Sequence, residues 1–168
     1  MPSPESDLRA AAAAVVHRLV DRRETLASAE SLTGGLIAAT LVEIPGVSAV
    51  FRGGLVVYAT DLKHALAGVP ADLLAERGPV DPDVARALAA GARERCGADW
   101  GVATTGVAGP EPQDGKPVGM VFVAVAGPFG ATVRELKLAG NRAVIRTESV
   151  TSALWLLTDC LQEAPAPA

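Results

Sequence analysis

The sequence of 168 residues is poor in aromatic residues, cysteine and histidine, and it carries no surplus of positive charge. Aromatic residues make up 4% of the chain although 49% of it is hydrophobic, so the core must consist mainly of alanine, valine and leucine. The net charge of −4 argues against non-specific nucleic-acid binding, which requires a positive surface that displaces counterions. It leaves room for a small anionic ligand, which needs only a local group of donors.

Membrane-spanning segments and metal-binding motifs are also missing. Glycine, proline or a charge interrupts every apolar run before it reaches the roughly 20 residues needed to span a membrane, and the N-terminus does not resemble a secretory signal. Cys96 and Cys160 lack metal-ligand spacing, and His17 and His64 lie in no ligand motif. We therefore expect a cytoplasmic protein with free thiols that binds no membrane, no nucleic acid, no metal and no other cofactor.

Hydrophobic periodicity and turn residues predict alternating helices and strands, then consecutive strands, then a closing helix. We expect helices at 7–22, 35–44, 61–69, 70–78, 81–97 and 141–164, and strands at 25–30, 51–60, 98–106, 118–127 and 131–138. This order predicts an α/β protein, a three-layer α/β/α sandwich with a mixed sheet. Residues 1–168 show no repeat, linker or shift in composition, so we expect one domain, frayed at 1–4 and 163–168.

Local signals define some of these boundaries. Ser6 or Asp7 is expected to cap the first helix. Asp81 is expected to cap the fifth helix, with Pro82 at its first helical position. Gly53 and Gly54 predict a bulge or a close backbone approach in the second strand. A turn of sequence GPFG between the last two strands predicts an antiparallel hairpin.

The segment ESLTGG, residues 30–35, places two hydroxyl residues and two glycines between a strand and a helix. Ser31 or Thr33 would make a good N-cap, and Gly34 and Gly35 allow a tight turn, which is explanation enough for either hydroxyl alone. Free backbone N–H groups at a helix start also attract phosphate or an oxyanion. A hydroxyl held there beside a base can act as a nucleophile, although the pattern G-x-S-x-G is absent.

Residues 58–64, of sequence YATDLKH, supply two candidates for that base. Most lysines are solvated, but a partly desolvated Lys63 would have a lowered pKa and could accept the proton of Ser31. His64 is the alternative. Adjacent helical residues point about 100° apart, so only one of the two is expected to face the site, and the spacing does not decide which.

Two later segments contain candidate ligand-binding residues. Thr104 or Thr105 ends a strand before a loop rich in glycine and proline, although a strand-end threonine without a ligand is the commoner case. That loop is no phosphate-binding Walker loop, because Pro117 stands where Ser or Thr should bind magnesium. Arg142 and Arg146 lie on one face at the start of the closing helix, where the helix dipole disfavours cations, so they indicate a neighbouring anion such as a ligand phosphate or a partner carboxylate.

The chain resembles the family of the C-terminal domain of the competence-damage-inducible protein CinA, also found alone as nicotinamide-nucleotide amidohydrolase. The segments that carry the resemblance are, in order, AESLTGGLIAATL, PGVSAVFRGGLVVYATDLKHALAGVP, GPVDPDVARALAAGARERCGAD, TTGVAGP and KPVGMVFVAV. The resemblance implies an α/β/α domain that hydrolyses the carboxamide of nicotinamide mononucleotide to nicotinic acid mononucleotide and ammonia without a metal, in pyridine-nucleotide salvage. Two-domain relatives carry an additional N-terminal pyrophosphatase domain, which is missing here, so we expect only the amidohydrolase activity.

Matched residue by residue, the resemblance implies Ser31 as nucleophile, Lys63 as its base, and catalytic roles for Thr105 and Tyr58. It implies that substrate is bound by the turn and by the later basic residues, that is by Glu30, Thr33, Gly34, Gly35, Gly106, Arg142 and Arg146. The loop EPQDGKP, residues 111–117, departs from the family's glycine-rich loop and is bulkier and more acidic. This loop motivates an alternative function, a non-catalytic nucleotide-binding or regulatory module. The sequence also leaves open a homo-oligomer in which a partner subunit supplies an arginine to the site.

Overall fold

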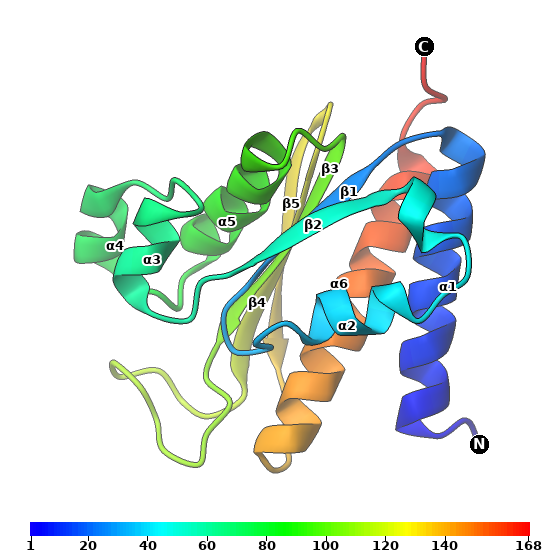
Figure 1. Cartoon of the computed structure of the whole chain (residues 1–168). Coiled ribbons are helices and arrows are strands. Elements are labelled where there is room, and N and C mark those ends of the chain that lie inside the picture. Colours follow the sequence, from blue (N-terminus) through cyan, green and yellow to red (C-terminus); the bar gives the residue numbers. More distant parts are fainter.

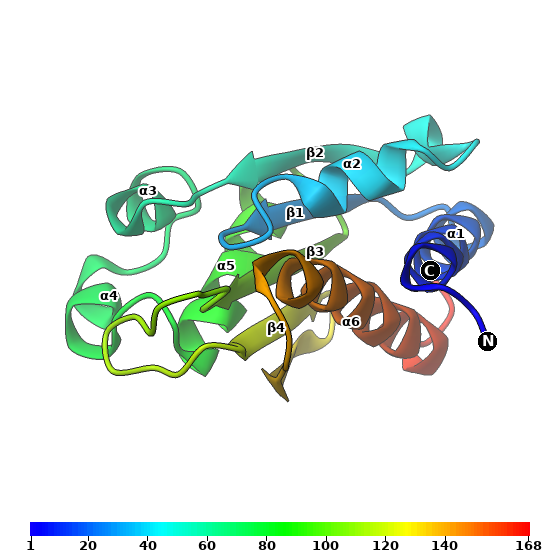
Figure 2. The same ribbon diagram turned by 90° about the horizontal axis from the view of Figure 1, so that it is seen from below.

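A five-stranded mixed sheet separates two layers of helices (Figures 1 and 2) in the computed structural model, which describes residues 1–168. The elements are α1 (Pro4–Arg22), β1 (Leu26–Glu30), α2 (Leu36–Val42), the 3₁₀ turn η1 (Val47–Ala49), β2 (Phe51–Val56), α3 (Thr60–Ala65), α4 (Ala71–Arg77), α5 (Pro82–Arg95), β3 (Trp100–Gly106), β4 (Met120–Gly127), β5 (Gly130–Lys137) and α6 (Arg142–Glu163). Helices α1, α2 and α6 cover one face of the sheet, and α5, with α3 and α4 beside it, covers the other. The expected three-layer α/β/α sandwich is confirmed.

The strand order is β2-β1-β3-β4-β5. Strand β1 runs parallel to both β2 and β3, whereas β4 and β5 form the predicted antiparallel hairpin. The pairing of β1 with β2 shifts register between Leu26, paired with Phe51, and Ala27, paired with Gly53, so Arg52 is the extra residue and the predicted bulge is confirmed beside Gly53. Because β1, β2 and β3 are parallel, their carboxyl ends meet at one edge of the sheet, and the segments that follow them lie side by side there.

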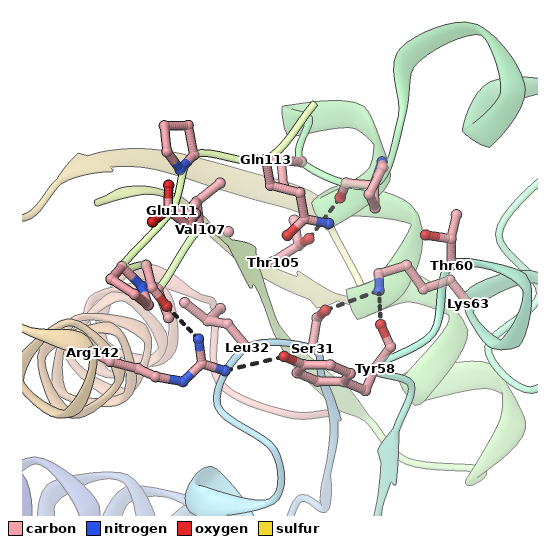
Figure 3. A pocket seen from close by; sticks show the side chains of 17 residues that line it. Ser31, Leu32, Tyr58, Thr60, Lys63, Thr105, Val107, Glu111, Gln113 and Arg142 are labelled. Carbon is pink, nitrogen blue, oxygen red and sulfur yellow. Dashed lines mark hydrogen bonds between the residues drawn. The ribbon is translucent and has the colours of Figure 1, made fainter. Parts of the chain in front are cut away.

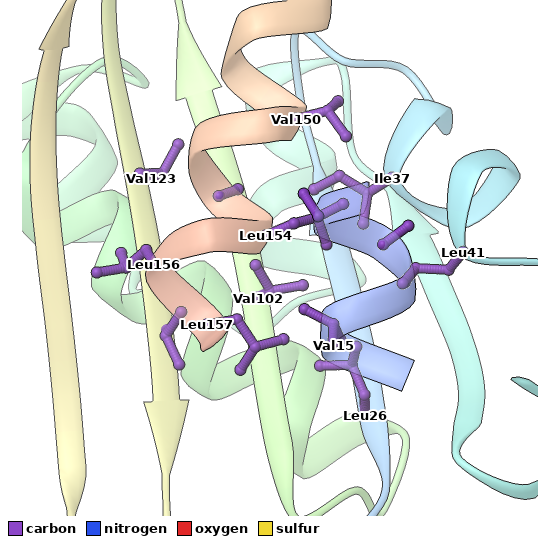
Figure 4. Close-up of a cluster of buried hydrophobic side chains, with 14 of the residues drawn as sticks. Val15, Leu26, Ile37, Leu41, Val102, Val123, Val150, Leu154, Leu156 and Leu157 are labelled. Atoms are coloured by element: carbon purple, nitrogen blue, oxygen red, sulfur yellow. The ribbon is translucent and has the colours of Figure 1, made fainter. Parts of the chain in front are cut away.

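The hydrophobic core lies in two layers, one on each face of the sheet. Figure 4 shows the larger layer, where Leu154 and Leu157 of α6 pack over Val102 of β3 and against α1 and α2. Complete burial of each such leucine contributes about 1.5–3 kcal/mol. On the other face α5 lies directly on β3. Gly101 allows this close approach because it has no side chain, and a Cβ atom there would lie 2.0 Å from the carbonyl oxygen of Ala89. Small residues therefore provide close packing where aromatic residues are scarce.

The capping signals predict one helix start correctly and another wrongly. Asp81 accepts hydrogen bonds from two backbone N–H groups of the first turn of α5, as predicted. The first helix begins earlier than expected, with Ser3 as its cap rather than Ser6 or Asp7. The reason is Pro4, whose fixed φ suits the first helical position and whose missing N–H costs nothing there. None of the helices combines the length and the apolar character needed to cross a membrane.

Candidate active site

A cavity of about 270 Å³ opens at the edge where the three parallel strands end (Figure 3). Ser31 follows β1, Tyr58 follows β2, and Thr105 lies at the end of β3, so chain segments far apart in sequence meet at this cavity. Its volume lies just below the range of about 300–1,000 Å³ typical of small-molecule sites. Ligands of open α/β sheets bind at this position, outside the carboxyl ends of the strands.

Lys63 and Ser31 are in direct contact at this cavity. The Nζ atom of Lys63 lies 2.9 Å from Oγ of Ser31, and it also donates to the backbone carbonyls of Val57 at 2.8 Å and Tyr58 at 3.2 Å. Only 1% of Lys63 is exposed, and this burial lowers the pKa of its ammonium from 10.5 to about 8. All three partners of Nζ are uncharged oxygen atoms, so no carboxylate counteracts the effect of desolvation.

The early end of β2 allows Lys63 to form its hydrogen bonds with the backbone. Strand β2 ends at Val56, four residues before the predicted end, because the chain leaves the sheet to enter α3. The carbonyls of Val57 and Tyr58 are therefore free to accept hydrogen bonds from Lys63. His64, the alternative base, has Nδ1 2.8 Å from the carbonyl of Val69 and does not line the cavity. The geometry thus favours Lys63 over His64.

The turn after Ser31 has a different structure from the one expected. Helix α2 begins at Leu36, and neither Ser31 nor Thr33 caps it; its N-cap is Gly35, with a φ of 104° that suits glycine. The side chain that satisfies the first N–H groups is Glu30, whose carboxylate accepts hydrogen bonds from the backbone of residues 37 and 38 and from the hydroxyl of Thr33. A carboxylate is a stronger acceptor than a hydroxyl, and a negative charge is favourable at a helix start.

Four residues predicted to bind substrate lie outside the cavity lining. They are Glu30, Thr33, Gly34 and Gly35. Glu30 is 1% exposed and Thr33 is completely buried, and Thr33 also pairs with Thr104 at 2.8 Å. The carboxylate of Glu30 bonds to Thr33 and to the start of α2, and Thr33 bonds to Thr104 of β3, so these two side chains hold the turn in place instead of lining the cavity.

The backbone of the turn nevertheless offers a donor beside Ser31. The N–H of Gly34 donates to the carbonyl of Ser31 at 3.0 Å, and the N–H of Ser31 donates to the carbonyl of Thr104. The N–H of Leu32 forms no hydrogen bond within the chain, and Leu32 lines the cavity. The N–H groups of Thr33 and Gly35 also form no hydrogen bond within the chain, but neither residue lines the cavity, so Leu32 carries the free donor beside Ser31.

Thr105 and Gly106 both line the cavity. The hydroxyl of Thr105 donates to the carbonyl of Pro79 at 2.6 Å, so its only hydrogen is already engaged. This geometry therefore does not support a catalytic role for Thr105 as a hydrogen-bond donor to an oxyanion. Its oxygen can still accept a hydrogen bond from a group in the cavity.

Tyr58 and Arg142 form the rim of the cavity. The phenol of Tyr58, a residue that is 61% exposed, accepts a hydrogen bond from Nη2 of Arg142 at 3.1 Å. Nη1 of Arg142 donates to the carbonyl of Gly109 at 2.5 Å. The contact of Tyr58 with Lys63 is made by its backbone carbonyl and not by its side chain, as Figure 3 shows.

Arg146 does not line the cavity, in contrast to the prediction of a basic pair around one anion. Its Nε donates to the carbonyl of Leu32 at 2.9 Å and its Nη2 to the carbonyl of Thr33 at 3.0 Å. The anionic partner inferred from the sequence is therefore replaced by two backbone carbonyls. Their approach depends on how α6 packs against the turn, which helix periodicity does not reveal.

Several cavity residues were not predicted individually. They are Leu32, Thr60, Pro79, Val80, Val107, Ala108, Gly109, Pro110, Glu111, Pro112 and Gln113. The unusual loop at 111–117 was the available signal for the last three, and its acidic and amide side chains reach the cavity (Figure 3). Nowhere in the chain do three or more His, Cys, Asp or Glu side chains gather in a cluster that could hold a metal ion.

The fold and the cavity define an α/β domain with a small-molecule site at the carboxyl ends of its parallel strands. The family model of the CinA C-terminal domain matches residues 8–161, and the chain belongs to this family. A CinA-like protein of Frankia casuarinae is 52% identical over 90% of the chain and 35% of its own length. A CinA-like protein of Geobacter sulfurreducens is 49% identical over 85% of the chain and, again, 35% of its own length, so the chain spans about a third of these relatives.

Solved structures agree with this assignment. The competence/damage-inducible protein CihA of Agrobacterium tumefaciens has a TM-score of 0.88 and 36% identity, and the match covers 94% of this chain and 96% of CihA. A CinA superfamily protein of Klebsiella pneumoniae has a TM-score of 0.90 and 27% identity, over 94% and 99% of the two chains. The fold of the whole domain is therefore that of the CinA superfamily.

Proposed function

We propose that the chain is a cytoplasmic amidohydrolase that converts nicotinamide mononucleotide to nicotinic acid mononucleotide and ammonia, with Ser31 as nucleophile and Lys63 as base. The observation that carries the proposal is the 2.9 Å contact between Nζ and Oγ at the strand-end cavity. A serine hydroxyl beside a base of lowered pKa is the arrangement that nucleophilic catalysis requires. The choice of substrate rests on the family resemblance. The proposed reaction would belong to pyridine-nucleotide salvage.

The surroundings of Lys63 orient its amine for this task. In the neutral amine, two hydrogens can donate to the carbonyls of Val57 and Tyr58. The fourth direction of the tetrahedral nitrogen can then present the lone pair to the hydroxyl of Ser31. An ammonium would instead donate all three of its hydrogens to the same three oxygens, so both protonation states fit with little movement.

The proposed reaction passes through an acyl-serine. The Oγ–H proton of Ser31 moves to Nζ of Lys63 while Oγ bonds to the carboxamide carbon, and the N–H of Leu32 stabilises the resulting oxyanion. One such donor contributes about 3 kcal/mol to the transition state. Protonated Lys63 then gives its proton to the departing nitrogen as the C–N bond breaks, which releases ammonia. Water then loses a proton to Lys63 as it attacks the ester, and Lys63 returns this proton to Oγ of Ser31 as the C–O bond breaks, which frees the carboxylic acid and restores the enzyme.

The rim would hold the rest of the nucleotide. Arg142 is the one arginine that lines the cavity, so it is the candidate contact for the 5′-phosphate. The oxygen of Thr105 could accept a hydrogen bond from the carboxamide nitrogen.

An ammonia assay tests the proposal. Purified protein is incubated with nicotinamide mononucleotide and a chelator, and ammonia is measured through a coupled enzyme. We expect steady release of ammonia and an equal amount of nicotinic acid mononucleotide. Absence of ammonia at high protein concentration would reject the reaction for this substrate, and a panel of other small amides would then show whether a different amide is hydrolysed.

The loop at 111–117 favours one alternative function. Glu111, Pro112 and Gln113 line the cavity and make its mouth bulkier and more acidic than a glycine-rich loop would. On this alternative the domain binds a mononucleotide without hydrolysing it, as a regulatory module. Calorimetry with nicotinamide mononucleotide distinguishes the two functions, because heat of binding without ammonia release supports the module.

A further inference from the structure

The guanidinium of Arg146 is fixed against the turn that follows Ser31. Arg146 is half-buried in the first turns of α6, and it donates to the carbonyls of both Leu32 and Thr33 within 3.0 Å. The planar fork of arginine suits two neighbouring carbonyls, which the single ammonium of lysine cannot hold in the same geometry. Two of its donors are thus engaged by backbone carbonyls.

These two hydrogen bonds control the direction of further peptide groups. In a trans peptide the C=O and the N–H point in opposite directions. The peptide between Thr33 and Gly34 is held at both ends, because its carbonyl accepts from Arg146 and from the N–H of Leu36, and its N–H donates to the carbonyl of Ser31. The peptide between Ser31 and Leu32 is fixed in turn by that second bond. Its own N–H, on Leu32, is left pointing the opposite way without a partner in the chain.

We propose that Arg146 is a positioning residue that, through this relay of two peptide groups, aims the N–H of Leu32 at the oxyanion formed when Ser31 attacks. The inference rests on the proposed function, but it assigns Arg146 a role other than phosphate binding. Arg142, four residues earlier on the same helix, lines the cavity and would contact the substrate itself. The two arginines should therefore affect different kinetic constants.

The test compares Arg146→Lys with Arg142→Lys, and with Arg134→Lys as a control far from the cavity. For ammonia release from nicotinamide mononucleotide we expect Arg146→Lys to lower kcat by about 10–100-fold, less than the 10²–10³-fold loss of a deleted oxyanion donor, with KM within twofold. Arg142→Lys should raise KM and change kcat little. A raised KM with unchanged kcat in Arg146→Lys would overturn the proposal and indicate phosphate binding.

A second measurement separates this inference from the identity of the substrate. A fluorophosphonate probe reacts with an activated serine by forming an Oγ–P bond as fluoride leaves, and in the tetrahedral adduct the phosphoryl oxygen occupies the oxyanion position. We expect Ser31 to be labelled about 10–100-fold more slowly in Arg146→Lys, and at the wild-type rate in Arg134→Lys. Equal labelling rates in all three would overturn the inference, even where the wild type releases no ammonia from the nucleotide. If Arg146→Lys fails to fold, Arg146→Gln, which keeps one amide donor, replaces it in both measurements.

Discussion

At the scale of single residues, the account depends on the protonation state of Lys63. Its amine is almost completely buried, its partners are uncharged oxygens, and its pKa is lowered to about 8. Near pH 7 roughly a tenth of the molecules would then carry the neutral amine that can accept the proton of Ser31. An ordinary lysine, with a pKa near 10.5, would provide far fewer.

This pKa predicts a pH dependence of the reaction. Only the neutral amine acts as base, so kcat/KM should rise about tenfold per pH unit below pH 8 and level off above it. The measurement is the initial rate of ammonia release at low substrate concentration between pH 6 and 9.5. A profile that is flat over this range, or that falls as the pH rises, would contradict the role of Lys63.

Replacement of the base gives a second prediction. Lys63→Arg keeps a positive charge but cannot deprotonate, so we expect kcat to fall at least about 10²-fold. Since guanidinium is larger than ammonium, circular dichroism and thermal unfolding must show that the variant is folded. His64→Ala is the control for a change in the same helix, and it should keep the wild-type rate. Wild-type kcat in folded Lys63→Arg would limit Lys63 to an electrostatic role.

At the scale of secondary-structure elements, Glu30 joins β1 to the start of α2. Its carboxylate accepts hydrogen bonds from Thr33 Oγ1 at 2.7 Å, from the N–H of Ile37 at 2.8 Å and from the N–H of Ala38 at 3.2 Å. All three partners are donors, so the site needs a group that only accepts. An amide would turn its NH₂ group towards one of them.

Glu30→Gln is therefore expected to destabilise the fold. We predict a loss of about 1–3 kcal/mol in the free energy of unfolding, because one buried donor loses its acceptor. Urea unfolding with an unchanged m-value measures this loss. The control is Glu43→Gln, since Glu43 is exposed and contacts Arg9 only at 4.0 Å, and its effect should stay within about 0.5 kcal/mol. Equal midpoints for Glu30→Gln and the wild type would show that the cap contributes nothing.

Local signals predict some of this architecture, and tertiary contacts decide the rest. The cap at Asp81 and the final hairpin depend on neighbouring residues, so the sequence alone predicts them. Arg146 binds the carbonyl of Thr33, 113 positions away, and Thr105 binds the carbonyl of Pro79, 26 positions away. Such contacts depend on how separate elements pack, so the sequence indicates polar residues near the site but not their partners.

At the scale of the whole molecule, the parallel strands bring the candidate site together. The ends of β1 and β3 and the helices α3 and α6 place Ser31, Thr105, Lys63 and Arg142 around one cavity within a single chain. The CinA-like relatives are about three times as long as this chain. Every group assigned a part in the proposed reaction lies within the 168 residues of this chain.

The most direct measurement of the central claim is ammonia release by two serine variants from the same strand region. Ser31→Ala removes the proposed nucleophile. Ser28→Ala removes a completely buried hydroxyl that has no hydrogen-bond partner, so its stability should be equal to or higher than that of the wild type. We predict that Ser31→Ala is folded and releases no ammonia from nicotinamide mononucleotide, whereas Ser28→Ala keeps the wild-type rate. Ammonia release by Ser31→Ala at the wild-type rate would contradict the account.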